Sequence, residues 1–175
     1  NNWTDPKAIS ITARHMSMMT IEELLPYVRA ELQASGLWDD AYDEEKKQWF
    51  VDTVNLIRTR LHTLNDFAIA GRPYFSDDFT FEDAAVAKNL KKDERVKQLL
   101  IDTAEHFDKL SVFNIEHAEN VIRELAERSG VKPGLIINAV RTAVTGQSAG
   151  PGLFELLVAI GKERVVRRLK KAAEI

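Results

Sequence analysis

The segment from residue 141 to residue 155 has the residue types and spacing of a ligand-binding turn between two helices. It reads Arg141-Thr-Ala-Val-Thr-Gly146, then Gln147-Ser-Ala-Gly-Pro-Gly152, then Leu153-Phe154-Glu155. Its glycines let the backbone approach a ligand, and the N–H groups at the start of the second helix attract anions. Single-stranded RNA loops are recognised by stacking and by hydrogen bonds to base edges.

Two interpretations of this segment stay open. In the first, Leu153 and Phe154 contact an unstacked base, and Arg141 reaches a base edge or a phosphate. In the second, the segment is an ordinary interhelical turn, and both apolar residues belong to the core.

No other residues form a self-sufficient catalytic or metal-binding set. The chain has no cysteine, no Gly-x-Gly-x-x-Gly, no P-loop and no His-Glu-x-x-His. His106 follows Asp102 by four positions on one helical face, which fits either half of a metal site or a surface hydrogen bond. The adjacent acids at 39–40 and 77–78 do not face each other, so they predict caps and turns. We therefore expect no catalytic site, no metal and no cofactor in this chain.

The elements that must position these residues are all helical, because helical periodicity dominates and strand alternation is nearly absent. Helices are predicted over 7–15, 20–35, 96–110, 114–129, 133–145, 151–160 and 162–173, with a short one ending at 90. The expected signals at their ends are N-caps at Thr20 and Asn114, Pro133 in a first turn, and Gly130 and Gly146 after a last turn. Pro26 either interrupts its helix or begins the next one. A long helix is predicted with Asp43 as N-cap, the apolar series from Phe50 to Ala68 as its buried stripe, and Gly71 at its C′ position.

The charged region 88–95 is interpreted as a hinge, which predicts two helical subdomains, residues 1–90 and 91–175. Charge is uneven along the chain. Residues 1–130 contain 16 Lys/Arg and 24 Asp/Glu, a net charge of −8, whereas residues 131–175 contain 8 and 3, a net charge of +5. The basic end indicates either a polyanionic partner or a solvated helix face.

Composition places the chain among ordinary folded proteins. It has 175 residues, of which 45% are hydrophobic and 29% charged, so a core can form and disorder is not expected. No apolar run is long enough for a membrane helix. The absence of cysteine favours the cytoplasm. Because the chain begins with Asn1 and no targeting pattern follows, we expect it to be a piece of a longer protein.

The 141–155 segment also carries a resemblance to a known family. Together with Ile160-Gly-Lys-Glu-Arg164 and Arg168-Leu169, it closely resembles the C-terminal anticodon-binding region of bacterial-type glutamyl-tRNA synthetases. That family's pattern runs Arg-Val-Ala-Leu-Thr-Gly, a short turn, Pro-x-Leu-Phe and Leu-Gly-Lys-Glu-Arg. Looser similarity extends upstream to Leu56-Ile-Arg-Thr-Arg60 and to Thr20-Ile-Glu-Glu-Leu24 with Pro26.

The resemblance implies a helical module whose second subdomain forms a cage around the anticodon loop of tRNA(Glu). In the family, a separate catalytic half uses ATP and Mg²⁺ to attach glutamate to the tRNA, and it carries His-x-Gly-His and Lys-Met-Ser-Lys-Ser motifs. Neither motif occurs in these 175 residues. We therefore expect this chain to bind tRNA without charging it.

The resemblance also assigns roles to individual residues. Arg141 matches the motif arginine, and Asn138 stands where relatives often carry Gln, which has one more methylene. Gly150 stands where some relatives carry a hydroxyl, so only backbone contact remains there. The implied anticodon contacts are Arg141, Asn138, Arg123, Gly150, Pro151, Leu153, Phe154 and Arg60. The basic residues expected to contact phosphates are Arg164, Arg167, Arg168 and Lys171.

The implied partners are tRNA(Glu), with tRNA(Gln) left open, and the catalytic half of the parent enzyme. A cytoplasmic monomer without membrane contact is expected. The alternative is a helical protein–protein scaffold derived from this domain. Its binding surface would be the acidic first part of the chain together with the aromatic loop of residues 74–81.

Overall fold

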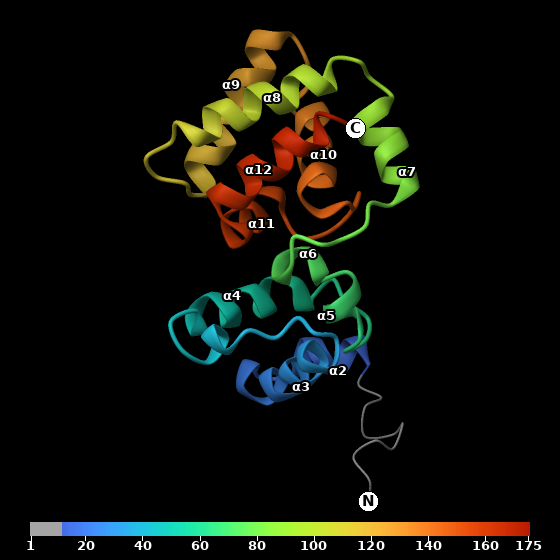
Figure 1. The fold of residues 1–175 in the computed structure, drawn as a ribbon, viewed down its shortest axis with the longest axis vertical. Coiled ribbons are helices and arrows are strands. Elements are labelled where there is room, and N and C mark those ends of the chain that lie inside the picture. The colour runs from blue at the N-terminus through green and yellow to red at the C-terminus, as the bar shows by residue number, and fades with distance from the viewer. Residues whose placement is uncertain (1–11) are drawn as a thin grey trace, which may run out of the picture. The chain divides into compact units, whose positions relative to one another are not determined.

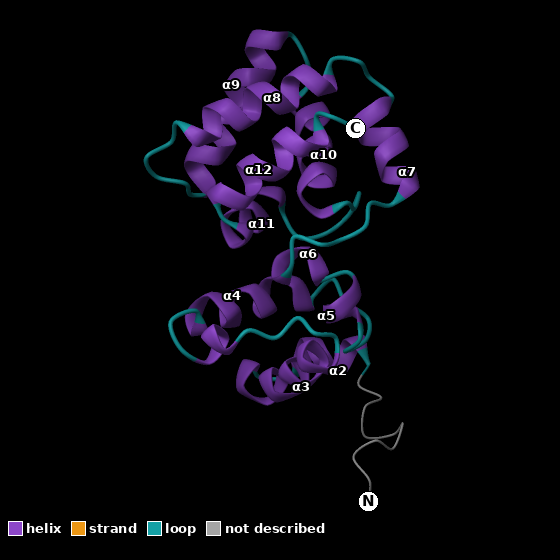
Figure 2. Ribbon diagram, viewed as in Figure 1, coloured by secondary structure: helices purple, strands orange, loops and turns teal. Residues whose placement is uncertain are grey.

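The computed structural model describes residues 12–175, and every regular element in that range is a helix (Figure 2). The prediction of an all-α fold is confirmed. The chain folds as two compact units, one ending at Asp78 and the other beginning at Phe79. This boundary comes before the predicted one at residue 90. The reason is that residues 79–91 pack with the second unit, where the Glu82 N–H donates to the Gly146 carbonyl (2.8 Å).

The first unit is a group of helices (Figure 1). Several aromatic side chains form a cluster within it. Tyr42 and Phe50 stack with their ring centroids 5.1 Å apart, and Trp38 meets both rings edge-on. Phe75 completes the cluster. The described helices are α2 (Ala13–Met18), α3 (Ile21–Ala34), the 3₁₀ turn η1 (Asp40–Asp43), α4 (Lys47–Arg58), α5 (Asp66–Ile69) and α6 (Arg72–Phe75).

The start of the first unit follows local signals in part. Thr12 caps α2, and residues 7–11 of the helix predicted over 7–15 lie outside the described residues. The predicted cap at Thr20 is confirmed, because its side chain accepts the Glu23 N–H (3.2 Å). Both expectations for Pro26 were wrong, since α3 continues through it. Its buried stripe of Leu24, Val28 and Leu32 outweighs the one backbone hydrogen bond that proline removes.

The predicted long helix from Asp43 to Gly71 was wrong. Helix α4 begins only at Lys47, because Asp43 pairs with Arg29 (2.7 Å) instead of capping it. The chain leaves α4 after Arg58 and re-enters a helix at Asp66, whose carboxylate accepts the backbone N–H groups of residues 62 and 63. Gly71 has φ −81° rather than a left-handed conformation. A Cβ there would collide with the Phe67 carbonyl, so close approach requires this glycine.

The second unit is built around one central helix, α10 (Pro133–Thr145), which contacts five other elements of the unit (Figure 1). Six of the seven residues from Ala139 to Thr145 are buried, as expected of a helix covered on every side. The other elements are α7 (Asp83–Ala85), the π-helix η2 (Val86–Lys91), α8 (Val96–Asp108), α9 (Ile115–Ser129), α11 (Leu153–Ile160) and α12 (Lys162–Ala172).

Helix boundaries in the second unit agree closely with the sequence. Asn114 caps α9 by accepting the His117 N–H (2.8 Å), and Gly130 ends that helix in the left-handed conformation. Pro133 occupies the first turn of α10 and Gly146 ends it. Helix α11 begins at Leu153 rather than at Pro151. The predicted hinge at 88–95 is partly helical, because η2 extends to Lys91.

Two of these helix-ending glycines provide a matched test of packing. Gly130 and Gly146 have φ values of 67° and 74°, but only at Gly146 would a Cβ collide with backbone, at the Thr80 carbonyl. We expect Gly130→Ala to lower the free energy of unfolding by about 1 kcal/mol. Gly146→Ala is expected to lower it by roughly 3 kcal/mol, because steric overlap adds to backbone strain. Urea denaturation measures both, and equal losses would contradict the close approach of Thr80.

Candidate nucleic-acid interface

The turn of residues 146–152 joins α10 to α11 and is fastened to the end of α10 by hydrogen bonds. We call it the 146–152 turn. The Thr145 hydroxyl donates to the Arg141 carbonyl (2.7 Å) and accepts the Gln147 N–H (3.1 Å). The Thr142 hydroxyl donates to the Gln147 carbonyl (3.1 Å). The turn therefore leaves α10 along a defined path instead of as a loose loop.

Arg141 holds the far side of the same turn. Its guanidinium is half-buried and Nη1 donates to the Pro151 carbonyl. A Cβ placed on Gly150 would lie 3.5 Å from that nitrogen. The structure therefore brings together Arg141, Gly150 and Pro151, three residues that the sequence assigned to one site. The Arg141 guanidinium therefore lies close to the backbone of Gly150, which carries no side chain.

The predicted apolar contacts divide into core and surface. Leu153 is only 4% exposed, so the interpretation as a core residue is correct for it. Pro151 is also buried. Phe154 is half-buried and keeps part of its ring at the surface. The predicted anion site at the start of α11 was wrong in one respect. The Glu155 carboxylate lies over Gly152, so an acidic side chain already covers that helix end.

The remaining predicted anticodon contacts lie on three elements. Asn138 is exposed on α10, one turn before Arg141, so both project from the same face of the helix. Arg123 on α9 pairs with Glu119 (2.7 Å), an exposed pair of the kind that contributes little to stability. Arg60 is exposed in the turn that follows α4 in the first unit, whereas the other residues belong to the second unit.

The four predicted phosphate contacts on α12 differ in their surroundings. Arg167 and Lys171 are exposed, one helical turn apart. Arg164 is half-buried, and its Nε donates to the Ile160 carbonyl at the end of α11 (2.8 Å). Arg168 is only 5% exposed, and its Nη1 donates to the Val144 carbonyl (2.8 Å). The prediction of Arg168 as a phosphate contact was therefore wrong, because its guanidinium is used inside the unit.

Arg168 also organises a part of the chain that the sequence did not connect with the site. Its guanidinium lies 4.7 Å from the centre of the Phe79 ring, a cation–π contact, and Phe79 stacks on Phe81. Tyr74 is buried, and Phe75 packs in the aromatic cluster of the first unit. The rings of the 74–81 loop thus make contacts within their own units, although Phe75, Phe79 and Phe81 are half-buried and keep part of each ring at the surface.

Asn89 is a further residue that sequence reasoning missed. It is 8% exposed, and its Nδ2 donates to the Thr142 hydroxyl (3.0 Å). The charged residues around it favoured a hinge, which concealed its burial. The only available signal was an amide beside Leu90 in a segment that was expected to be helical.

Other polar clusters have local roles. His106 Nδ1 lies 2.7 Å from the Asp102 backbone carbonyl, so its contact there is with backbone rather than with the carboxylate. Among residues 12–175, no three His, Cys, Asp or Glu side chains lie together as a metal site would require. No helix in the described part of the chain is long and apolar enough to cross a membrane.

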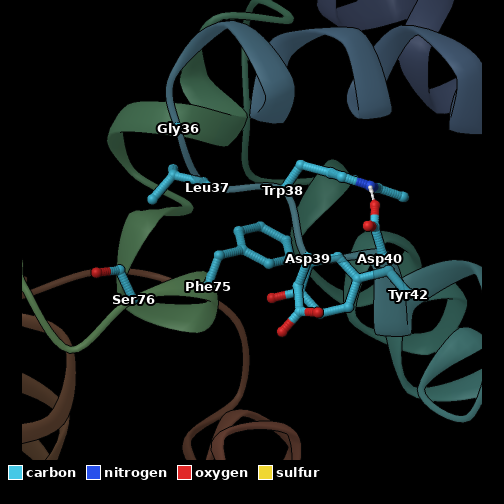
Figure 3. Close-up of a pocket in the computed structure, with 8 residues that line it drawn as sticks. All are labelled: Gly36, Leu37, Trp38, Asp39, Asp40, Tyr42, Phe75 and Ser76. Carbon is cyan, nitrogen blue, oxygen red and sulfur yellow. Dashed lines mark hydrogen bonds between the residues drawn. The ribbon is translucent and has the colours of Figure 1, made fainter.

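One pocket in the first unit combines acidic and aromatic residues (Figure 3). The Asp40 carboxylate accepts the Trp38 indole N–H (3.2 Å), and Asp39 accepts the Ala41 backbone N–H (2.9 Å). Both acids therefore stabilise the chain around η1, as the predicted caps and turns would. The pocket holds no facing pair of carboxylates for acid–base catalysis.

Residues 19–173 match a family model described as the anticodon binding domain. The chain belongs to the anticodon-binding domain family. The match covers nearly all of the described residues and includes α10, the 146–152 turn and α11. It confirms the family resemblance that the 141–155 segment predicted.

Curated relatives agree with this assignment. The chain is 46% identical over 173 residues to a glutamate–tRNA ligase of Desulfotalea psychrophila, and 36% identical over 170 residues to glutamate–tRNA ligase 2 of Koribacter versatilis. These alignments cover 99% and 97% of this chain but 35% of each relative. The chain therefore spans little more than a third of the length of these relatives.

The fold is also found in solved structures. A glutamate tRNA ligase from Elizabethkingia meningosepticum, in complex with its amino acid, is similar with a TM-score of 0.78 and 23% identity. The similarity covers 96% of this chain and 32% of that one. At this identity the likeness establishes the fold alone.

The two neighbouring arginines of α12 test the distinction between buried and exposed cations in this domain. We expect Arg168→Met to lower the free energy of unfolding by about 2–4 kcal/mol, because it removes the hydrogen bond to Val144 and the cation–π contact with Phe79. Arg167→Met, the matched control on the exposed face, is expected to change it by no more than about 0.5 kcal/mol. Urea unfolding compares them, and a stable Arg168→Met variant would refute the structural role.

Proposed function

We propose that this chain recognises the anticodon loop of tRNA(Glu) as the RNA-binding module of a glutamate–tRNA ligase. The observation that carries the proposal is the 46% identity to a protein of that name over 99% of this chain. The geometry of the 146–152 turn supports it. The turn exposes backbone at Gly150, and the Arg141 guanidinium lies close to it. The turn belongs to a domain of the anticodon-binding family.

In this proposal, residues of α10, of the turn and of α11 make different contacts with the RNA. Asn138 offers one amide donor and one carbonyl acceptor to a base edge from the exposed face of α10. Arg141 holds the corner through Pro151 and adds positive charge beside it. The exposed part of Phe154 provides apolar surface for an unstacked base. Each good contact with a base contributes roughly 1–3 kcal/mol of binding free energy.

Phosphate attraction comes from the exposed cations. Arg167 and Lys171 lie one turn apart on α12. Arg123 forms a weak surface ion pair with Glu119 in the free chain, and in the complex it contacts a phosphate instead. Arg164 lies at the junction of α11 and α12, and Arg60 adds an exposed cation on the first unit. These contacts hold the loop without reading its sequence.

The charging reaction belongs to the part of the relatives that this chain does not span. Catalytic residues, ATP and Mg²⁺ are proposed to reside there, and that catalytic half is the proposed protein partner. tRNA(Gln) is a second candidate ligand. We further propose that the domain acts as a monomer in the cytoplasm.

The decisive experiment is a titration of the 175-residue chain with a tRNA(Glu) anticodon stem-loop at several salt concentrations. We expect the cognate loop to bind more tightly than a scrambled loop, with a slope of log K against log [salt] of about −3.5 for the five proposed phosphate contacts. A tRNA(Gln) stem-loop measures discrimination between the two acceptors. Equal binding of cognate and scrambled loops would reduce the module to a basic patch. Absence of binding by the folded chain would refute RNA recognition by this module.

Asn138 provides a test of base recognition that leaves the fold intact. We expect Asn138→Ala to weaken cognate binding by about 1–3 kcal/mol, because it removes an amide from the reading face. The salt dependence is expected to stay the same, since no charge is lost. Asn55→Ala, which removes an exposed amide from α4, is the matched control and should bind like the original chain. Fluorescence anisotropy with labelled stem-loop gives both affinities, and equal values for the two variants would exclude Asn138 as a base contact.

A further inference from the structure

A buried chain of polar groups runs from η2 to the 146–152 turn. Asn89 on η2 donates from Nδ2 to the Thr142 hydroxyl (3.0 Å), and that hydroxyl donates to the Gln147 carbonyl (3.1 Å). Thr142 is fully buried and Asn89 is 8% exposed. We call these three groups the 89–142–147 relay.

The direction of the relay is set by the chemistry of its members. A hydroxyl has one proton, so Thr142 can donate to Gln147 only if its other partner donates to it. The amide nitrogen of Asn89 is such a donor. A carboxylate at position 89 would accept instead, and it would compete with Gln147 for the single Thr142 proton. Because the Asn89 amide donates to the Thr142 hydroxyl, that hydroxyl can donate its single proton to the Gln147 carbonyl.

The relay fixes the place where the turn begins. Gln147 follows Gly146, and its N–H is already held by the Thr145 hydroxyl. With its carbonyl held by Thr142, the peptide groups on both sides of Gln147 have defined orientations. Those orientations set the path of the backbone toward Gly150 and toward Pro151, whose carbonyl Arg141 holds.

Filling space would not require these polar groups. A buried apolar pair of similar size would fill the same volume without the cost of removing an amide and a hydroxyl from water. The amide also lies on a π-helical turn, a rare conformation that is frequent at functional sites. Unlike an apolar pair, Asn89 and Thr142 fix the orientation of one specific group, the Gln147 carbonyl of the turn.

We propose that Asn89 and Thr142 are positioning residues for RNA recognition, which orient the 146–152 turn without touching the ligand. This inference rests on the proposed function, because it gives the turn its role in binding. It adds a determinant on η2 that lies outside the 141–155 segment. Loss of the relay lowers affinity for the anticodon loop while the phosphate contacts stay in place.

A pair of threonine substitutions separates positioning from stability. Thr142→Val removes the relay hydroxyl at nearly constant volume. Thr103→Val is the matched control, because Thr103 is also fully buried in the second unit and its hydroxyl donates only to the Leu99 carbonyl of its own helix (2.7 Å). We expect Thr142→Val to weaken binding of the tRNA(Glu) stem-loop about 3- to 30-fold. Thr103→Val should bind like the original chain even if it unfolds more readily.

Further variants test the relay as a unit. Thr142→Ser retains the hydroxyl and is expected to restore most of the affinity. Asn89→Leu is expected to weaken binding as Thr142→Val does. The double variant should bind no more weakly than either single variant, because each substitution alone already interrupts the same chain of hydrogen bonds. The salt slope should not change in any of them. Additive losses, or equal affinities of the Thr142→Val and Thr103→Val variants, would overturn the proposal.

A measurement without RNA separates this inference from the proposed function. The N–H groups of Gly146 and Gln147 are hydrogen-bonded to the Thr142 carbonyl and the Thr145 hydroxyl, so their exchange with solvent reports how firmly the start of the turn is held. Amide hydrogen exchange at these two residues in the free chain is expected to be faster in Thr142→Val than in Thr103→Val. If the original chain failed to bind the stem-loop, the proposed function would fall, and faster exchange would still establish that the relay orients the turn. Unchanged exchange at Gly146 and Gln147 would overturn the positioning role, whatever the result with RNA.

Discussion

The second unit depends on satisfying the carbonyl groups at the buried end of α10. A helix leaves its last carbonyls without partners inside the helix, and a buried carbonyl without a partner costs about 1–3 kcal/mol. Here two of the partners come from distant parts of the chain, and the third comes from α10 itself. Arg168 on α12 donates to Val144, the Glu82 N–H donates to Gly146, and Thr142, supported by Asn89, donates to Gln147. The same contacts that close the helix also fix the start of the 146–152 turn. Stability and the geometry of the candidate site therefore rest on shared groups.

This constraint explains why the basic end of the chain cannot be interpreted from charge alone. On α12, Arg164 and Arg168 are four residues apart, and their guanidinium groups hold the carbonyls of Ile160 and Val144. Arg167 and Lys171 are also four apart, and they lie exposed on another face. Net charge counts all four equally, but only the second pair is fully exposed. Periodicity indicated that Arg168 is buried, because it follows Val165 by three residues and precedes Ala172 by four, which places it on the buried stripe of the helix.

The sequence was informative wherever a local rule decided the outcome. Asn114, Gly130 and Pro133 act within one helical turn, and their roles agree with prediction. Prediction failed where a partner distant in the chain decided. Asp43 is an ion-pair partner of Arg29, 14 residues away, and not a cap. A local contact was also missed, because Asp66 accepts the N–H groups of residues 62 and 63 and so holds a turn within an apolar stripe that looked continuous. The site follows the same division. The residues of the 141–155 segment were found by pattern. The partners of Arg168 and Asn89, in contrast, depend on packing between elements, which no spacing of residues encodes.

Burial of Leu153 changes how the 146–152 turn can read a base. A side chain that is 4% exposed supports the turn from below and offers little surface to a ligand. Under the proposed function, discrimination then rests on the amide of Asn138, the exposed part of Phe154 and the backbone around Gly150. Backbone groups cannot adjust by changing rotamer, so they read a base only if the turn is held in the correct place. A turn that reads through its backbone therefore needs the dense hydrogen bonding found around it. Under the proposed function, the polar residues buried next to this turn contribute to its specificity as well as to its fold.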